Sequence, residues 1–297
     1  MNMQQRLSLV FGLLLGLCIA SVTEGALTLS LEASYAKASP FGLAYDSSSG
    51  NLFWQSSSST IHQMTTSGVD LGAAFDTTNP IGWSALGFND ATGQLVSATN
   101  QTIYFFDPIT GANQTTLTVA DNMVGFVGLQ DGLDFDHNEV WVSPDVGNVY
   151  RFDASGQSVA GDNGSGTANP VLGGGGGYSG VERVDIGATS YLIVVNDATN
   201  PRRLDVRELD GTLIDSFQFA NARYEDLAFD GRYLWAADYF GNKIDKYDIL
   251  SDGGSIFVPP GGGNGAVPEP ASVMIWGAIG LVGMAGPLFS KKRKQAR

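Results

Sequence analysis

Apolar and polar residues alternate in short runs through most of the chain, and Gly, Asn and Asp separate the runs. The clearest stretch, residues 226–249, predicts three short strands at Leu227–Phe229, Tyr233–Ala237 and Lys243–Tyr247. Asp230-Gly231 lies between the first two strands, and residues 238–242 lie between the second and third. Because Asp, Asn and Gly tolerate positive φ, these segments favour tight hairpins. The stretch therefore predicts a three-stranded antiparallel unit.

Four earlier stretches repeat this pattern less regularly, and they cover residues 42–68, 85–111, 132–156 and 183–211. We align the five units on an apolar residue of the first strand, which is Leu43, Leu86, Leu133, Val184 and Leu227. Successive members of this series are 43, 47, 51 and 43 residues apart. A period of about 45 residues with three or four strands per repeat is typical of a β-propeller.

An outer strand is expected after each of the first four units, at residues 69–75, 115–119, 157–160 and 212–219. The fifth unit is followed only by a short apolar run. An isolated alternating segment, Leu27–Leu31, precedes the first unit. We expect it to pair with the fifth unit and close the ring, because this hides two strand edges. The prediction is an all-β propeller over residues 26–250 with five blades, or six if the Gly-rich segment 161–177 contains another.

The charge of this region limits its partners. Residues 26–266 carry 10 basic and 28 acidic side chains, a net charge of −18. Such a surface repels phosphate backbones, so we expect no nucleic-acid partner. The only cysteine, Cys18, lies in the N-terminal apolar run. If that run is removed, the protein has no disulfide, no Cys-zinc site and no cysteine nucleophile.

Residues 1–25 are typical of a secretory signal peptide. Arg6 supplies a positive charge before the apolar run Leu7–Ala20, and Ala20 or Gly25 provides a small residue for cleavage. The alternative is a membrane anchor, although an apolar run of 14 residues is short for a span. The sequence therefore predicts export.

The C-terminal end combines three segments after a flexible Gly/Pro-rich linker at residues 251–266. Val267-Pro268-Glu269-Pro270 is followed by the apolar run 271–289, which predicts a transmembrane helix, and by the basic cluster Lys291, Lys292, Arg293 and Lys294. This order, over residues 267–297, resembles the PEP-CTERM sorting signal of bacterial surface proteins. The resemblance implies that an exosortase-type membrane enzyme recognises Pro268, Glu269 and Pro270. It also implies a membrane-anchored intermediate, followed by delivery to the cell envelope or extracellular matrix. A plain membrane anchor is the alternative.

The body carries the sequence LWAADYFGNKIDKYD at residues 234–248. It resembles the blade of NHL-repeat and gluconolactonase-like propellers, in which Asp and Asn flank the hairpin between the second and third strands. Such hairpins share one end of the ring with the loops that lead into each first strand. The resemblance therefore implies a ligand face there, and our candidates for it are Trp83, Tyr178, Tyr224, Asp145 and Asp238.

Three carboxylates, Asp131, Glu182 and Glu225, lie near the start of predicted first strands. If these positions are equivalent, the side chains surround one mouth of the central channel. Hard cations such as Ca²⁺ bind several oxygen ligands of this kind, and a similarly placed Glu binds a metal in gluconolactonase-like propellers. The alternative is an acidic rim that is solvated or paired with Arg183, Arg223 and Arg232. Beyond Ca²⁺ we expect no cofactor.

Catalytic motifs are sparse. His62 and His137 are the only histidines, and no Gly-x-Ser-x-Gly sequence is present. We therefore expect an exported bacterial surface or matrix protein whose propeller is a binding or structural module, with an extracellular polysaccharide or a surface protein as partner. The alternative function is a metal-dependent lactonase or hydrolase with its site at the channel mouth.

Overall fold

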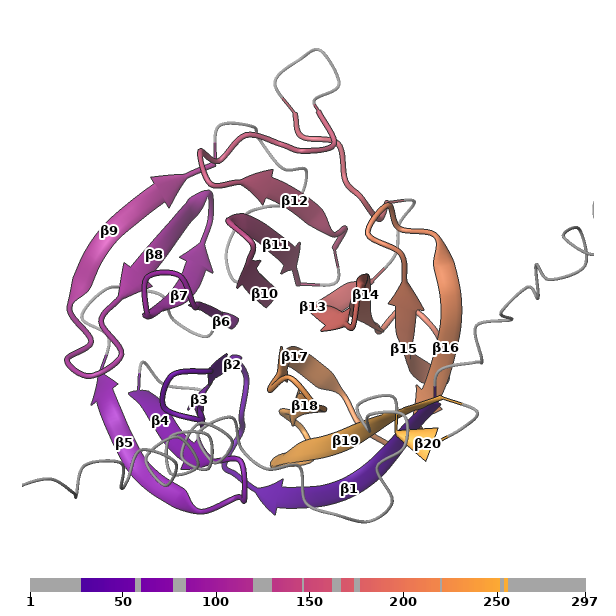
Figure 1. Ribbon diagram of the computed structural model, residues 1–297, viewed down its shortest axis with the longest axis horizontal. Helices are drawn as coiled ribbons and strands as arrows, with labels where there is room; N and C mark the ends of the chain where they lie inside the picture. The colour runs from indigo at the N-terminus through magenta and orange to yellow at the C-terminus, as the bar shows by residue number, and fades with distance from the viewer. Residues whose placement is uncertain are drawn as a thin grey trace, which may run out of the picture. The chain divides into compact units, whose positions relative to one another are not determined.

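Short antiparallel sheets are arranged around a common axis, with their first strands innermost (Figure 1). The computed structural model describes residues 28–56, 60–76, 84–119, 130–145, 147–161, 167–173, 177–219, 221–251 and 254–255. These residues form five sheets and no helix, so the predicted β-propeller is confirmed with five blades. No helix of this part of the chain is long and apolar enough to cross a membrane. The predicted signal peptide, most of the linker and the sorting signal lie outside the described residues.

The first two blades each contain four strands in sequential order. Blade one is formed by β2 (Leu43–Asp46), β3 (Asn51–Gln55), β4 (Thr60–Thr65) and β5 (Asp70–Asp76). Blade two is formed by β6 (Leu86–Asn89), β7 (Gln94–Thr99), β8 (Thr102–Phe106) and β9 (Asn113–Thr118). The inner strands are largely buried and the outermost strands are mostly exposed. The outer strands expected at 69–75 and 115–119 are therefore confirmed to within two residues.

Blades three and four differ in their outer edges. Blade three contains β10 (Gln130–Asp136), β11 (Glu139–Pro144) and β12 (Tyr150–Asp153). Blade four contains β13 (Tyr178–Ile186), β14 (Thr189–Asn196), β15 (Arg202–Arg207) and β16 (Leu213–Phe219). The prediction of an outer strand at residues 157–160 was wrong. Two consecutive turns, ending at Gly156 and Gly161, leave only one bridge there, between Ser158 and Phe152.

The first strand of the described chain completes the last blade. Blade five contains β17 (Tyr224–Phe229), β18 (Tyr233–Asp238) and β19 (Lys243–Ser251), with the short β20 (Gly254–Ser255) beside β19. The outer edge of β19 pairs antiparallel with β1 (Thr28–Ala36), as Figure 1 shows. The predicted closure is confirmed. Both strands are longer than expected, because pairing extends from Thr28 opposite Leu250 to Ala36 opposite Lys243.

The core lies between neighbouring blades. Each of the five buried clusters combines side chains from two adjacent blades. Between blades two and three, for example, Phe105 meets Phe135 edge-to-face with ring centroids 5.4 Å apart. The largest fully buried side chains are Trp141 and Trp235, which lie on the second strands β11 and β18. Packing between blades therefore holds the ring together.

The first strands approach one another closely at the axis because small residues line it. Gly42, Ala85, Gly132 and Gly180 occupy the same position in blades one to four, immediately before Leu43, Leu86, Leu133 and Val181. A Cβ atom on Gly132 would lie 2.5 Å from the backbone oxygen of Ser179. Val181, and not the predicted Val184, is therefore the blade-four member of the series. The prediction failed because β13 continues five residues past Val181, whereas β17 ends two residues past Leu227, so the position counted back from the hairpin fell on Val184.

Blade five carries Asp226 at this axial position. Its fully buried carboxylate accepts backbone N–H bonds from Leu43 at 2.8 Å, Leu86 at 2.9 Å and Leu133 at 3.4 Å. It also accepts one from Leu227 of its own blade at 3.0 Å. Complete burial raises the pKa of Asp226, and the four N–H donors oppose that shift. One side chain thus ties four first strands together and closes the centre of the ring.

Candidate functional site

Two cavities lie on either side of the Asp226 carboxylate along the axis. The first, which we call the mouth cavity, has a volume of about 220 Å³ and is lined by Phe41, Asp131, Asp145, Arg223, Glu225, Tyr239 and Phe240. The second, which we call the turn cavity, has a volume of about 320 Å³ and is formed around the turns that follow the first strands. Strand β10 runs from one to the other, with Asp131 in the mouth cavity and Asp136 in the turn cavity.

Bulges in the first strands position the acidic groups of the mouth cavity. In β10, Gln130 and Gly132 pair with consecutive residues of β11, so Asp131 is an extra residue. Strand β17 has the same irregularity, and its extra residue is Glu225. A bulge re-aims the side chain of the inserted residue. The two bulges therefore place Asp131 and Glu225 at the same end of the axis.

Burial dominates the electrostatics of these two carboxyl groups. Burial, followed by the negative charges of Glu225 and Asp145, raises the pKa of Asp131 from 3.8 to about 9. Asp131 also shares a hydrogen bond with Asp145, which requires a proton between the two carboxyl groups. Burial raises the pKa of Glu225 from 4.5 to about 7, although nearby Arg223 opposes the shift. The mouth cavity therefore holds protons at neutral pH that exposed carboxyl groups would release.

Arg223 is the basic residue of the mouth cavity. Its guanidinium lies 3.0 Å from Glu225 and 3.1 Å from Asp197, and its nearest approach to Asp145 is 3.9 Å. The same group stacks over Phe240, with 5.0 Å between the guanidinium carbon and the ring centroid. The Arg-paired acidic rim, considered as an alternative from the sequence, thus describes Glu225 well.

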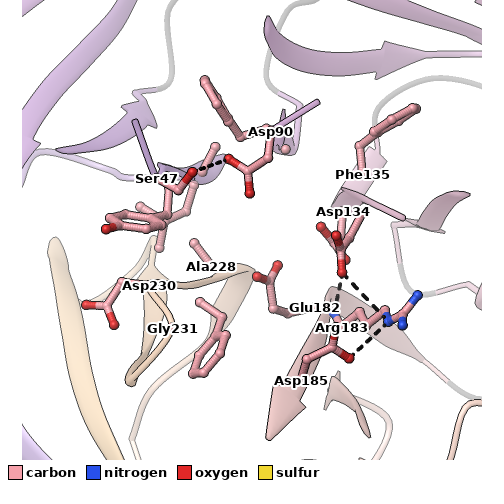
Figure 2. A pocket seen from close by; sticks show the side chains of 17 residues that line it. Ser47, Asp90, Asp134, Phe135, Glu182, Arg183, Asp185, Ala228, Asp230 and Gly231 are labelled. Atoms are coloured by element: carbon pink, nitrogen blue, oxygen red, sulfur yellow. Dashed lines mark hydrogen bonds and ion pairs between the residues drawn. The ribbon is translucent and has the colours of Figure 1, made fainter. Parts of the chain in front are cut away.

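The turn cavity is strongly acidic (Figure 2). Glu182 and Asp134 point into it from β13 and β10, and both are buried. Burial, with the charges of Asp134 and Asp226, raises the pKa of Glu182 well above its usual value. Burial and the charge of Asp136 raise the pKa of Asp134 to about 7. The backbone N–H of Arg183 donates to Asp134 at 3.1 Å and partly offsets this shift.

A group that could hold a metal ion lies at the rim of the turn cavity. Asp136, His137 and Asp185 each offer one ligand atom, and these atoms all lie within 4.8 Å of one another. His137 is in contact with both acids, at 2.5 Å from Asp136 and 3.5 Å from Asp185. The guanidinium of Arg183 lies 3.3 Å from Asp185 and 3.7 Å from Asp136, so it already neutralises part of the group. A metal ion would therefore compete with Arg183.

The expected carboxylate trio is not brought together. Asp131 and Glu225 line the mouth cavity, whereas Glu182 lines the turn cavity. The physical reason is register: Ser179, and not Glu182, occupies the bulge position in β13 that Asp131 and Glu225 occupy in their strands. Glu182 lies three residues further along the strand and therefore faces the other end of the axis.

The ligand-face candidates are also separated. Asp145 lies in the mouth cavity and is largely exposed. Tyr178 and Tyr224 are buried, and the Tyr224 hydroxyl donates to Asp245 at 2.7 Å. Asp238 is also buried, and it accepts backbone N–H bonds from Arg223 and Gly241. One further predicted position and two segments lie outside the described residues: Trp83, the motif Pro268, Glu269 and Pro270, and the basic cluster Lys291, Lys292, Arg293 and Lys294.

Several residues of the two cavities were not singled out from the sequence. Phe240 was missed because it lies in a hairpin loop, and the loop conformation decides where its ring points. His137 has positive φ in the turn after β10, and Asp136 is the last residue of that strand, so their sequence context is that of an ordinary hairpin turn. Asp226 could have been noticed in the sequence, because the other blades carry Gly or Ala at the position before the aligned apolar residue.

No protein-family model matches the chain, and no curated protein matches it either. The resemblances to PEP-CTERM proteins and to NHL-repeat or gluconolactonase-like propellers therefore stay predictions, apart from the propeller fold itself.

Proposed function

We propose that this protein is an exported bacterial surface or matrix component whose propeller binds a partner without chemical turnover. The observation that carries the binding role is the mouth cavity, where Asp131 and Glu225 are buried yet each retains one oxygen that accepts no hydrogen bond. Phe240 stands beside them with 61% of its surface exposed. Buried groups without partners next to an exposed aromatic side chain are typical of a recognition site.

Its size favours binding over catalysis. A cavity of about 220 Å³ is smaller than the ~300–1,000 Å³ of sites that enclose a whole small molecule. It suits a single protruding group of a larger partner. The carboxyl groups of Asp131 and Glu225 also hold protons at neutral pH, so their charge develops when a partner with a positive group enters.

The test uses full-length protein in detergent and two matched double variants. The first, Asp131→Asn with Glu225→Gln, changes the mouth cavity. The second, Asp136→Asn with Asp185→Asn, replaces the same number of carboxyl groups in the turn cavity. We expect wild-type protein and the second variant to be retained on immobilised bacterial envelope material, and the first variant to be lost. Equal retention of both variants, or no retention of wild-type protein, would contradict the proposal.

The proposed route to the surface rests on the two ends of the chain. We propose that the leader directs export, that the apolar run 271–289 holds an intermediate in the membrane, and that an exosortase-type enzyme acts at Pro268-Glu269-Pro270. Changing all three residues to Ala should trap the full-length protein in the membrane fraction. Release of the variant at the wild-type level would contradict this route.

A metal-dependent lactonase or hydrolase is the second candidate, favoured by the group Asp136, His137 and Asp185 beside Glu182. Ca²⁺ is the ion that we propose for such a role, because most of the nearby groups are carboxylates. This function requires Ca²⁺ to raise the melting temperature and to support lactone hydrolysis. Both effects should disappear in the variant Asp136→Asn with Asp185→Asn. Absence of both effects in wild-type protein would remove this candidate.

A further inference from the structure

The mouth cavity contains two buried acidic groups with unused acceptor oxygens. Asp131 and Glu225 are each only 2% exposed. Within the described part of the chain, Asp131 Oδ2 and Glu225 Oε2 accept no hydrogen bond. Such atoms are rare in folded proteins, because a buried polar group without a partner is costly. Because both residues line the mouth cavity, a single donor group in that cavity is the simplest partner for the two oxygens.

The charge balance of this cavity calls for a cation. Asp131, Asp145 and Glu225 line it, whereas Arg223 is its basic residue. The Arg223 charge is shared, because the guanidinium pairs with Glu225 and also with Asp197 outside the lining. In the free protein, the proton between Asp131 and Asp145 holds the negative charge down. An incoming positive group would take the place of that proton.

Aromatic side chains form the remaining wall. The rings of Phe41 and Tyr239 meet edge-to-face with centroids 6.0 Å apart, and those of Tyr239 and Phe240 are 5.0 Å apart. Aromatic faces attract cations and also pack against methylene groups. A ligand for this site should therefore carry a positive head for the carboxylates and an apolar stem for the rings.

Three kinds of cation fit less well. A divalent metal ion needs converging oxygen ligands, but among the described residues these carboxylates do not form a group of three with ligand atoms within 4.8 Å. A quaternary ammonium has no N–H to donate, so both oxygens would stay unpaired. A guanidinium prefers both oxygens of one carboxylate, whereas here the unpaired oxygens belong to two different residues.

We propose that the mouth cavity binds the side-chain ammonium of a lysine on a partner protein, with the N–H donors directed at Asp131 and Glu225 and the butyl stem beside Phe240. The inference rests on the proposed binding function and names its ligand. An ammonium group has three N–H donors, enough for both unpaired oxygens. A long unbranched stem reaches fully buried atoms. The amine of an amino sugar is attached directly to its ring, so ring hydroxyls would have to enter the aromatic wall.

The experiment is calorimetric titration of full-length protein in detergent with small probes. Nα-acetyl-lysine amide should bind with a dissociation constant on the order of 1 mM, as expected for a ligand of this size. Nα-acetyl-norleucine amide, which has a similar stem without the charge, should not bind measurably. Glucosamine, tetramethylammonium and CaCl2 complete the series, and each should bind at least about tenfold more weakly than the lysine probe.

Variants locate the site. Asp131→Asn with Glu225→Gln should weaken lysine-probe binding by about tenfold or more. Phe240→Ala, at an exposed position where we expect little change in stability, should weaken it by about two- to fivefold. The turn-cavity variant Asp136→Asn should change nothing. A lysine probe that binds all of these proteins equally, or no better than the norleucine probe, would overturn the proposal. Stronger binding of glucosamine or Ca²⁺ would replace the lysine ligand with that one.

The two proposals fail separately. If wild-type protein is retained on envelope material but no lysine probe binds, the lysine inference is wrong and the binding function stands. If the lysine probe binds in the mouth cavity but envelope material retains no protein, the proposed surface function is wrong and the lysine site stands.

Discussion

Glu225 and Asp226 are consecutive acidic residues on β17, and both are almost completely buried, yet their surroundings differ. Asp226 accepts four backbone N–H bonds, from Leu43, Leu86, Leu133 and Leu227. Glu225 pairs with Arg223 through one oxygen and leaves the other without a donor. The difference teaches that burial alone does not identify a functional carboxylate. The hydrogen bonds of a carboxylate show whether its oxygens already have donors within the fold.

The strongest test of this contrast is Asp226→Asn. The amide would keep one acceptor oxygen but would turn an NH2 group toward backbone N–H donors, which leaves two of them without a partner. We expect the free energy of unfolding to fall by about 3–5 kcal/mol. Urea denaturation followed by tryptophan fluorescence measures the change. Asp90→Asn, at an exposed position, is the control, and an equal loss in both variants would contradict the role of Asp226.

The Leu133 N–H reaches Asp226 because the first strands lie close together. The variant Gly132→Ala tests this close packing. The added Cβ would lie 2.5 Å from the backbone oxygen of Ser179, so the strands must separate. We expect a loss of about 1–3 kcal/mol in the free energy of unfolding. Ala85→Gly at the same position of blade two is the control and should cost about 1 kcal/mol or less. A Gly132→Ala protein as stable as wild type would show that the axis is loosely packed.

Asp131 should make stability depend on pH. Its pKa is raised from 3.8 to about 9 in the fold, so between these values the folded state holds a proton that the unfolded state releases. Stability should therefore fall as pH rises through this window, by at most about 1.4 kcal/mol per pH unit for this proton. Asp131→Asn should flatten the dependence and be the more stable protein at pH 8. Parallel urea midpoints for both proteins from pH 5 to 8 would rule this out.

Asp210→Asn serves as the control for that titration. Asp210 is exposed, and hydrogen bonds from Thr212 lower its pKa. A lowered pKa contributes stability above the unfolded value, and this contribution is lost only as pH falls toward the folded value. The stability of Asp210→Asn should therefore change with pH in the same way as that of wild-type protein between pH 5 and 8.

The smallest effect is expected for Phe240→Ala. The ring is 61% exposed, so its loss should change the free energy of unfolding by about 0.5 kcal/mol or less. The expected stability matters because the same substitution should weaken ligand binding, which separates a recognition residue from a structural one. Thermal unfolding by circular dichroism provides the measurement. A loss above about 2 kcal/mol would place Phe240 with the structural residues.

The ring of blades could be predicted well from the sequence because each repeat encodes its own strands and turns. Leu43, Leu86, Leu133 and Leu227 were aligned from apolar spacing, and all four now prove to donate their N–H to Asp226. Blade four was misaligned by three residues, because β13 continues five residues past Val181 whereas β17 ends two residues past Leu227, and the alignment followed the end of the strand.

The site was less accessible to such reasoning. Asp131 and Glu225 were found because both precede an aligned leucine by two residues. Arg223 and Phe240 come from segments before β17 and after β18, and only the folded loops bring them to the same cavity. The unpaired oxygens are a property of three-dimensional packing, and no spacing of residues in the chain encodes them.

The pairing of β1 with β19 has a consequence for the order of events in biosynthesis. Ser34 on β1 bonds to Asp245 on β19, and 211 positions along the chain separate them. A ribosome makes the nine residues of β1 before any blade and must then finish the fifth sheet before they find their partner. Until then, the edge strands at both ends of the incomplete ring are unpaired. Unpaired edge strands can pair with other chains and aggregate. A chaperone or a translocation channel that holds the nascent polypeptide until Lys243–Ser251 has emerged would prevent that aggregation.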